Sequence, residues 1–204
     1  MTLSRQAGIR RMRDNGFGVE RRDHPGGDSS EGVYRVIKRC FCHGDLKPEE
    51  MDNIAIEKVE RGSELAEELL RFVEQCSWIE ARDHIAQMIR EWVFTDWETM
   101  FVATMDGKII GMASVMKTDY YPLPDIRPWV SCVFVSEAYR GQRISGKMIA
   151  HANQYLKQQG FDRSYIPSEF AGLYEHYGYR YLRDIVNYGG GTDRLYVKEL
   201  EDRP

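Results

Sequence analysis

The pattern of hydrophobic and polar positions switches between the period of a strand and the period of a helix. Residues 54–59 predict a strand, and apolar residues then recur at helical spacing in two stretches up to Trp92. Two further alternating segments, 99–104 and Lys108–Met116, flank an Asp-Gly pair, which is typical of a hairpin turn. Trp129–Val135 is almost wholly apolar, which predicts a central strand covered on both faces.

Capping residues mark the ends of the predicted helices. Ser63 is the expected N-cap of the first helix, with Glu64 and Glu67 at the positive end of its dipole. A long helix is expected to start with Ser145 as its N-cap and to end at Gly160, which suits a left-handed C-cap. A short helix is expected at 169–177, and three more strands at 163–166, 179–186 and 194–197. This order of elements predicts an α/β (α+β) fold, with a mixed central β-sheet flanked by helices.

Residues 1–39 differ from the rest of the chain in charge. They hold nine Lys or Arg and five Asp or Glu, a net charge of +4 in a chain whose total is -4. A helical stretch followed by alternating segments at 17–21 and 33–37 predicts a short helix plus β-hairpin extension. This fragment resembles part of a winged helix-turn-helix, but it buries too little surface to be stable alone. Residues 40–50 are expected to form a linker, and 51–204 the main domain.

The composition of the 204 residues is that of a globular protein, with 42% hydrophobic and 29% charged side chains. No apolar run approaches the ~20 residues of a membrane helix, and no apolar stretch follows the N-terminus as in a secretory signal. The net negative charge argues against a nucleic-acid surface along the whole chain. The four scattered cysteines indicate a reducing compartment, so we expect a cytoplasmic protein without membrane or nucleic-acid partners.

Cys40, Cys42 and His43 form a short cluster of side chains that can bind metals. A structural zinc site needs four ligands, which usually come from two Cys or His pairs at defined spacing. No second pair follows, because Cys76 and Cys132 are isolated in the sequence. The sequence therefore predicts no metal site.

A basic loop containing glycine connects the apolar strand that ends at Val135 to the long helix. The first backbone N–H groups of a helix have no partner within it and lie at its positive end, so they favour an anion. Arg140, Arg143 and Lys147 add positive charge, and Gly141 lets a ligand approach the backbone closely. A phosphate or pyrophosphate is the expected ligand, and a basic loop that merely caps the helix is an equal alternative.

A second motif, Leu-Tyr-Glu-His-Tyr-Gly-Tyr at 173–179, lies about thirty residues downstream. Together with Arg-Gly-Gln-Arg-Ile-Ser at 140–145, it resembles the motif pair of the GNAT superfamily of acyl-CoA-dependent N-acetyltransferases. That pair is [RQ]-x-x-G-x-[GA] followed by L-Y-x-x-x-G-[FY]. Arg143 and Ser145 stand at the two later small-residue positions of the first motif. The resemblance covers about three quarters of the chain and implies a GNAT-like sheet from residue 51 onward.

The resemblance implies acetyl-CoA as co-substrate and direct transfer of its acetyl group to a primary amine of a small molecule or peptide. The phosphates would lie on the loop backbone, and the pantetheine would pair with the strand edge as an added strand does. Tyr174 would protonate the leaving thiolate as general acid, because a phenol of pKa near ~10 can donate to a thiolate. The residues that the resemblance assigns to cofactor binding are Phe134, Val135, Arg140, Gly141, Gln142, Arg143, Ile144, Ser145 and Gly146.

The general base is the least determined part of this hypothesis. The acceptor amine must lose a proton to a carboxylate or to water. Asp125 is the chosen candidate, because it enters the central strand where an acceptor would lie. Asp119 and Glu169 are the alternatives.

The segment before the central strand also carries aromatic residues that would line an acceptor site. Tyr120, Tyr121 and Trp129 predict a rigid wall suited to a small amine, or equally a stabilising hydrophobic corner. Whether the chain forms a homodimer is left open. The alternative function is a non-catalytic acyl-CoA-binding regulatory module, whose basic N-terminal segment contacts DNA or a protein partner.

Overall fold

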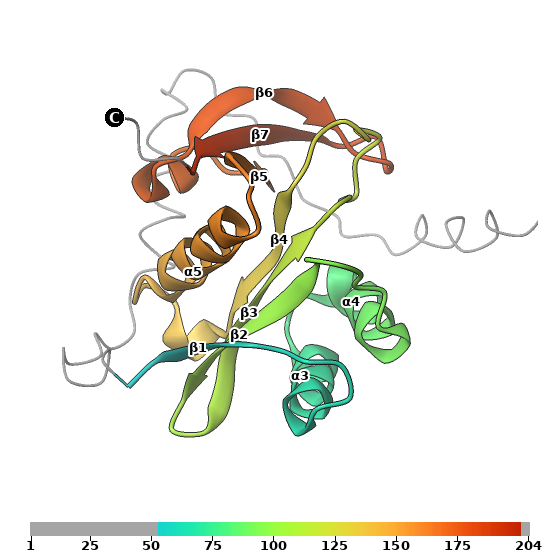
Figure 1. Cartoon of the computed structure of the whole chain (residues 1–204), viewed down its shortest axis with the longest axis vertical. Helices are drawn as coiled ribbons and strands as arrows, with labels where there is room; N and C mark the ends of the chain where they lie inside the picture. Colours follow the sequence, from blue (N-terminus) through green and yellow to red (C-terminus); the bar gives the residue numbers. More distant parts are fainter. Residues whose placement is uncertain (1–52, 201–204) are drawn as a thin grey trace, which may run out of the picture. The chain divides into compact units, whose positions relative to one another are not determined.

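A computed structural model describes residues 53–200, and a seven-stranded sheet forms the centre of this part of the chain (Figure 1). The strand order is β1-β2-β3-β4-β5-β7-β6, and all neighbours are antiparallel except β4 and β5. The strands are β1 Ala55–Lys58, β2 Thr99–Met105, β3 Lys108–Met116, β4 Trp129–Val135, β5 Arg163–Ser168, β6 Arg180–Val186 and β7 Thr192–Glu199. The predicted mixed sheet with a central strand at Trp129–Val135 is therefore confirmed.

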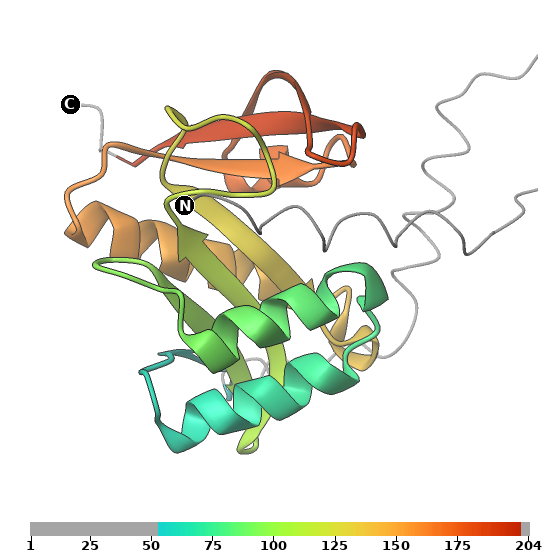
Figure 2. The ribbon, with the colours of Figure 1, turned by 90° about the vertical axis from the view of Figure 1, so that its right-hand side faces the viewer.

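Helices cover both faces of the sheet. Helices α3 (Glu64–Gln75) and α4 (Ile79–Glu91) lie on one face, and α5 (Ile144–Gln158) lies on the other, as Figures 1 and 2 show. Two 3-10 helices, η2 (Glu137–Tyr139) and η3 (Tyr174–Tyr177), follow β4 and β5. The predictions for the extension at 1–39, the linker at 40–50 and the cysteine cluster within it lie outside the described residues.

The start of α3 follows the capping signal in the sequence. The backbone N–H of Ala66 donates to Ser63 Oγ at 3.1 Å, and Glu64 and Glu67 occupy the first turn. The side-chain bond satisfies one of the backbone donors that a helix leaves unpaired at its start, and such a cap contributes about 1 kcal/mol. Ser63 is thus the N-cap, as the sequence predicts.

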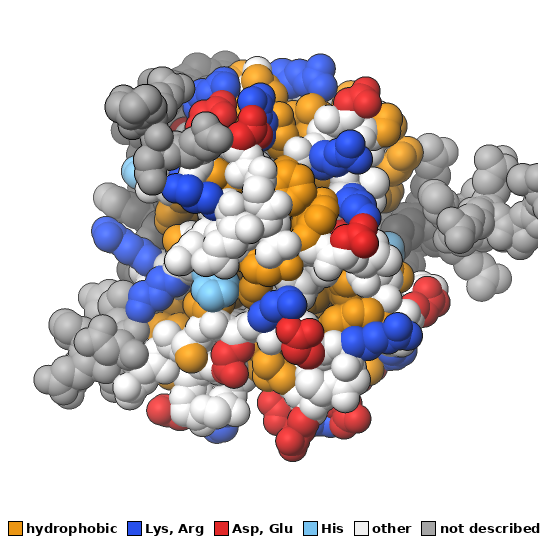
Figure 3. Space-filling model, viewed as in Figure 1, with side chains coloured by type: hydrophobic (Ala, Val, Ile, Leu, Met, Phe, Trp, Pro, Cys, Tyr) orange, Lys and Arg blue, Asp and Glu red, His pale blue; other side chains and the backbone are white. Residues whose placement is uncertain are grey.

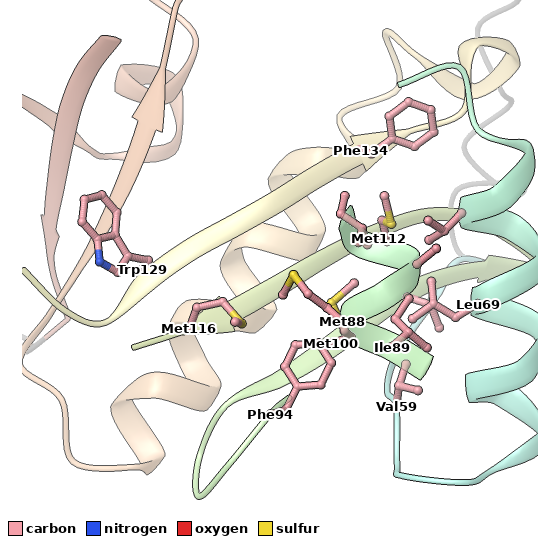
Figure 4. Packing of buried hydrophobic residues seen from close by; sticks show 14 of the residues in the cluster. Val59, Leu69, Met88, Ile89, Phe94, Met100, Met112, Met116, Trp129 and Phe134 are labelled. Carbon is pink, nitrogen blue, oxygen red and sulfur yellow. The ribbon is translucent and has the colours of Figure 1, made fainter. Parts of the chain in front are cut away.

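The core under α3 and α4 is rich in methionine. Met88 on α4 packs with Met100 and Met112 of the sheet in one buried cluster, which Trp129 and Phe134 of β4 also join (Figure 4). The flexible thioether side chain fills irregular space between a helix layer and a twisted sheet. Complete burial of such side chains contributes about 1.5–3 kcal/mol each, so this layer holds α3 and α4 firmly against β4.

Strand β4 is irregular, and its irregularity opens the sheet. Cys132 has a φ of 52°, and the pairing of β3 with β4 shifts between Met112 and Ser114. A bulge of this kind bends the strand and re-aims its neighbours. Among residues 53–200, β4 pairs with β5 only where Trp129 meets Tyr165. Over the rest of its length, the edge of β4 that faces β5 pairs with no strand of the described part of the chain.

Two local predictions were wrong. Helix α5 begins at Ile144 with Arg143 as the N-cap residue, and no side chain caps it. Ser145 lies inside the first turn, where its hydroxyl is 3.0 Å from the Tyr177 hydroxyl, so it cannot be the N-cap. The helix expected at 169–177 is reduced to η3, because the backbone is left-handed at Gly172 with a φ of 87°.

Candidate active site

The loop before α5 is shaped by two left-handed residues. Gly141 has a φ of 83°, and Arg143 has a φ of 58°. The second conformation costs a residue other than glycine about 1–2 kcal/mol, which gives a physical reason for glycine at this position in the first motif. The turn aims the first N–H groups of α5 at the space outside the helix. No acidic side chain lies in the first turn, so nothing there competes with an anion for these donors.

The side chains of this loop point in different directions. Gln142 and Ile144 are buried, and Ile144 packs in a cluster with Met148. These two residues therefore offer a ligand only their backbone groups. Arg143 is exposed, and Ser145 and Gly146 are half-buried. Charge for a phosphate comes from exposed Arg143 rather than from the buried positions.

Arg140, predicted to contact the phosphates, holds the end of β4 in this structure. Its Nε donates to the Val135 carbonyl oxygen at 2.9 Å, and its guanidinium lies 2.7 Å from the Glu137 carboxylate. The guanidinium also lies over the Phe134 ring, 5.5 Å from the ring centroid. The pKa of Glu137 is lowered first by a hydrogen bond from Ser77 and then by the charge of Arg140. Arg140 thus fixes the loop to β4.

Tyr177 covers the first turn of α5. An added Cβ atom at Gly146 would lie 2.6 Å from Cε1 of Tyr177, so only glycine allows the ring to pack this closely. The Tyr177 hydroxyl is 3.0 Å from Ser145 Oγ. Tyr177 is not among the site residues that the sequence predicts. The small residue at position 146 was the one signal of a close neighbour.

Tyr174, the predicted general acid, lies in a group of tyrosine rings. Its ring centroid is 6.4 Å from that of Tyr177, 6.2 Å from that of Tyr179 and 5.8 Å from that of Tyr196. Burial first, and then these neighbours, raise the pKa of Tyr174 well above its usual value. The phenol therefore stays protonated at neutral pH, as a general acid must. No hydrogen bond to another residue in the range 53–200 occupies its hydroxyl.

The unpaired edge of β4 ends beside a hollow. The side chain of Phe134 is buried and stacks on Trp78, with 6.4 Å between the ring centroids. The open edge of β4 is therefore formed by the backbone of Phe134 and not by its ring. A hollow of about 300 Å³ lies next to it. It is lined by Phe72, Gln75, Cys76, Ser77, Ile109, Phe134, Ser136 and Glu137.

The charge on the visible face of the molecule is mixed. In Figure 3, Lys and Arg side chains alternate with Asp and Glu and do not form one continuous basic patch on that face. On that face, attraction of a phosphate would come from local features. The first turn of α5 and Arg143 are such features.

Asp119 lies in the segment between β3 and β4, against the strand that carries the bulge. Its carboxylate accepts hydrogen bonds from the Ser131 hydroxyl and, at 2.5 Å, from the backbone N–H of Tyr120. Burial is the main cause that raises the pKa of Asp119, and the nearby charge of Asp193 raises it further. The two hydrogen bonds and the charge of His84 act in the opposite direction.

Tyr121 connects this segment to the β6–β7 hairpin. Its hydroxyl donates to Asp193 Oδ2 at 2.8 Å, and Asn187 Nδ2 donates to the same oxygen at 3.0 Å. The Tyr121 ring stacks on Trp129, with 5.6 Å between centroids. Of the predicted aromatic wall, Tyr121 and Trp129 thus lie together. Tyr120 is half-exposed and packs on Tyr188 of the hairpin.

The other two candidate bases are exposed. Asp125 lies in a turn of the segment before β4, and no hydrogen bond or ion pair within residues 53–200 holds its side chain. Glu169 is also exposed, and its charge is one cause of the raised pKa of Tyr121. Asp125 and Asp119 therefore lie on one segment but differ in burial and in contacts.

Residues 96–181 match the model of the protein family described as an acetyltransferase (GNAT) domain. Residues 96–181 therefore resemble a GNAT acetyltransferase domain. The match includes β4, the loop before α5 and both sequence motifs, so the family resemblance read from those motifs is confirmed. No curated protein sequence matches the chain.

Solved structures share the fold of the described part of the chain. An aminoglycoside 6'-acetyltransferase type Ii is 16% identical, with a TM-score of 0.58 over 74% of this chain and 99% of that one. An aminoglycoside 6'-N-acetyltransferase complexed with coenzyme A is 14% identical, with a TM-score of 0.57 and the same coverage of 74% and 99%. The aminoglycoside 6'-N-acetyltransferase from Enterococcus faecium is also 14% identical, with a TM-score of 0.57 over 74% of this chain and 99% of that one. At these identities the likeness shows the fold alone.

The fold brings most of the predicted residues to one region. The 140–146 loop, Tyr174 and Tyr177 meet at the start of α5, and Arg140 links the loop to Phe134 and Val135 of β4. Within the described part of the chain, no helix is long and apolar enough to span a membrane. Nor do three or more His, Cys, Asp or Glu side chains of residues 53–200 gather as metal ligands.

Proposed function

We propose that this protein is an N-acetyltransferase that moves an acetyl group from acetyl-CoA to a primary amine of a small molecule or peptide. The GNAT domain supports acetyl transfer in general. The observation that carries the proposal is the open edge of β4, which pairs with β5 only at Trp129 and is linked through Arg140 to the anion site of α5. An extended thiol-bearing arm with a phosphate end fits that combination of strand edge and helix start.

The residues at the start of α5 would hold the phosphates. The backbone N–H groups of Ile144, Ser145 and Gly146 supply donors at the positive end of the helix, and Arg143 supplies charge. Gly141 keeps the turn narrow enough for close approach. The unpaired backbone groups of Phe134 and Val135 would bind the pantetheine amides as a neighbouring strand would.

Bound acetyl-CoA supplies the reactive thioester. The acceptor amine attacks the thioester carbonyl carbon directly, and a backbone N–H near Phe134 polarises the carbonyl oxygen. Tyr174 donates its proton to the thiolate as the carbon–sulfur bond breaks. Its raised pKa keeps this proton in place until the thiolate forms. Asp125 stays the candidate base from the sequence, with Asp119 and Glu169 as the alternatives.

The remaining proposals concern location and partners. We infer a cytoplasmic protein, and Cys76 and Cys132 are unpaired thiols within the described residues. A homodimer stays a prediction. A role of the N-terminal segment in binding DNA or a protein also stays a prediction, because that segment lies outside the described residues.

Release of free thiol from acetyl-CoA tests the proposed function. The acceptor panel contains putrescine, tyramine, kanamycin and a lysine-bearing peptide, and thiol is measured with a chromogenic disulfide. We expect release with at least one amine, and acetyl-CoA should raise the Tm. Protection by acetyl-CoA without release for any amine would favour the non-catalytic acyl-CoA-binding module. Absence of both effects would contradict both functions.

A further inference from the structure

A small polar cluster interrupts the apolar face of the sheet under α4. Ser131 precedes the bulge at Cys132, and its hydroxyl donates to Asp119. Trp129, two residues before Ser131, and Phe134, just beyond the bulge, belong to the hydrophobic cluster on that face. A carboxylate held at this place is costly to bury unless it has a partner or a function. It is also attached to the strand whose open edge is proposed to receive the thioester.

Asp119 is held in position but is not saturated. One oxygen accepts the Ser131 hydroxyl, and the other accepts the backbone N–H of Tyr120 at 2.5 Å. A carboxylate has about four lone-pair positions. Two donors therefore leave about two of these positions to accept hydrogen bonds from an ammonium group. The two bonds come from different elements, β4 and the segment before it, which fixes the carboxylate relative to the bulge.

The acidic groups that face Asp119 differ in charge, because the thiol and the phenol beside it stay neutral and only the carboxylates are negative. Burial raises the pKa of the Cys132 thiol to about 12, and Asp119 adds to this effect. Burial and a bond to Asp193 raise the pKa of Tyr121, so both groups are neutral at pH 7. His84 of α4 is the basic side chain whose charge acts on Asp119. The two carboxylates of this group, Asp119 and Asp193, attract a cationic amine.

We propose that Asp119 is the general base that removes a proton from the ammonium group of the acceptor. This inference rests on the proposed function and completes it. The carboxylate takes one proton, and the amine forms a carbon–nitrogen bond to the acetyl carbon as the carbon–sulfur bond breaks. The thiolate takes the proton of Tyr174. The nitrogen then loses its second proton to solvent, solvent returns a proton to Tyr174, and Asp119 gives its proton to solvent, so one proton is released per acetyl group transferred.

The other carboxylates are less suited to this role. Asp193 lies on β7, two strands away from β4, and its Oδ2 is held between Tyr121 and Asn187. Asp125 is exposed, and no hydrogen bond or ion pair with another of residues 53–200 fixes its orientation. A buried carboxylate also has its pKa moved toward neutral pH, and general bases are most effective when their pKa lies near the working pH.

The test compares Asp119→Asn, Asp125→Asn and Asp106→Asn with the wild type, using the best amine of the panel. Asp106 lies in the exposed turn between β2 and β3 and serves as the matched carboxylate control. We expect Asp119→Asn to lower kcat/KM about 100-fold or more and to abolish the rising acid limb of its pH profile. Binding of acetyl-CoA, measured by calorimetry, should stay unchanged. Equal activity of Asp119→Asn and wild type, or a loss confined to Asp125→Asn, would overturn the proposal.

Ser131→Ala provides a second test of the role of Asp119, which remains valid if the Asp119→Asn variant fails to fold. The Ser131 hydrogen bond lowers the pKa of Asp119, so its loss should move the acid limb of the rate profile to higher pH. An unchanged limb in a folded Ser131→Ala protein contradicts the role of Asp119. If the wild type acetylates no amine of the panel, the transferase function fails, and the role of Asp119 fails with it. If the wild type transfers acetyl groups but Asp119→Asn changes neither kcat/KM nor the acid limb, only the role of Asp119 is refuted.

Discussion

Tyr177 lies against Gly146 so closely that a Cβ atom at position 146 would be 2.6 Å from Cε1 of the ring. The ring comes from η3, and the glycine lies in the first turn of α5. The Tyr177 hydroxyl also lies 3.0 Å from Ser145 Oγ, so the two motifs that indicated a GNAT domain in the sequence are in direct contact. The proposed phosphate site and the proposed acid site depend on the same packing.

Gly146→Ala should force Tyr177 away from α5. Because the phenol ring is rigid, we expect the overpacking to cost about 1–3 kcal/mol of unfolding free energy and to raise the KM for acetyl-CoA. Unfolding in urea and steady-state kinetics measure the two effects. In a Tyr177→Ala background the clash is absent, and alanine is favoured over glycine in a helix by up to about 1 kcal/mol. An equal cost of Gly146→Ala in both backgrounds would show that the contact has no energetic role.

The sequence predicted those parts of the fold that local signals determine. Strands Lys108–Met116 and Trp129–Val135 have the predicted limits, because the Asp-Gly turn marks the start of the first and an apolar run marks the second. Ser63 was identified as an N-cap because its partner, the N–H of Ala66, is three residues away. In contrast, Ser145 looked like a cap, but a partner 32 residues away engages its hydroxyl.

The polar contacts of the site could not be predicted in the same way. Asp119 meets Ser131 only because β3 and β4 are antiparallel neighbours with a bulge at Cys132. Tyr121 meets Asp193 across 72 positions of the sequence. Such pairs depend on the register of strands and on the course of loops, and no residue pattern along the chain records them. This is why the candidate bases looked alike in the sequence and differ in the structure.

Arg143→Gly should stabilise the domain and weaken cofactor binding. The left-handed conformation costs arginine about 1–2 kcal/mol. The greater freedom of glycine in the unfolded chain offsets about 0.5–1 kcal/mol of the gain. We therefore expect a small rise in Tm, a higher KM for acetyl-CoA and a weaker dependence of that KM on salt. Arg143→Lys keeps both the charge and the strained conformation, so its Tm and KM should stay near wild type. A fall in Tm for Arg143→Gly contradicts the strain argument.

Tyr174→Phe should separate catalysis from stability. The Tyr174 hydroxyl has no hydrogen-bond partner in the described part of the chain, so its removal should change the unfolding free energy by less than about 0.5 kcal/mol. We expect kcat to fall about 100-fold, with an unchanged KM for acetyl-CoA. Because the pKa of Tyr174 is raised, the wild-type rate should not decline through loss of this proton below pH ~10.

Tyr179→Phe is the matched control for Tyr174→Phe. The Tyr179 hydroxyl donates to Asn153 Oδ1 at 3.0 Å and lies 2.9 Å from Ser164 Oγ, in a buried group. Its loss leaves buried polar atoms without one partner, which should cost about 1–3 kcal/mol and leave kcat unchanged. Thermal unfolding and thiol release measure both variants. A reversed pattern, with kcat reduced only in Tyr179→Phe, would rule out Tyr174 as the acid.

Asp119→Asn should change how stability depends on pH. The folded state raises the pKa of Asp119, mainly by burial, so it binds this proton more tightly than the unfolded chain does. Its contribution to stability is fully present below the unfolded value of ~3.9 and is lost as pH rises through the folded value. Asparagine cannot titrate, so the Tm of the variant relative to wild type should increase between pH ~4 and ~7. Scanning fluorimetry across this range measures the difference, with Asp106→Asn as the control for the loss of one carboxylate. A difference that stays constant or decreases with pH would show that Asp119 is not held in the proton-binding environment that the structure describes.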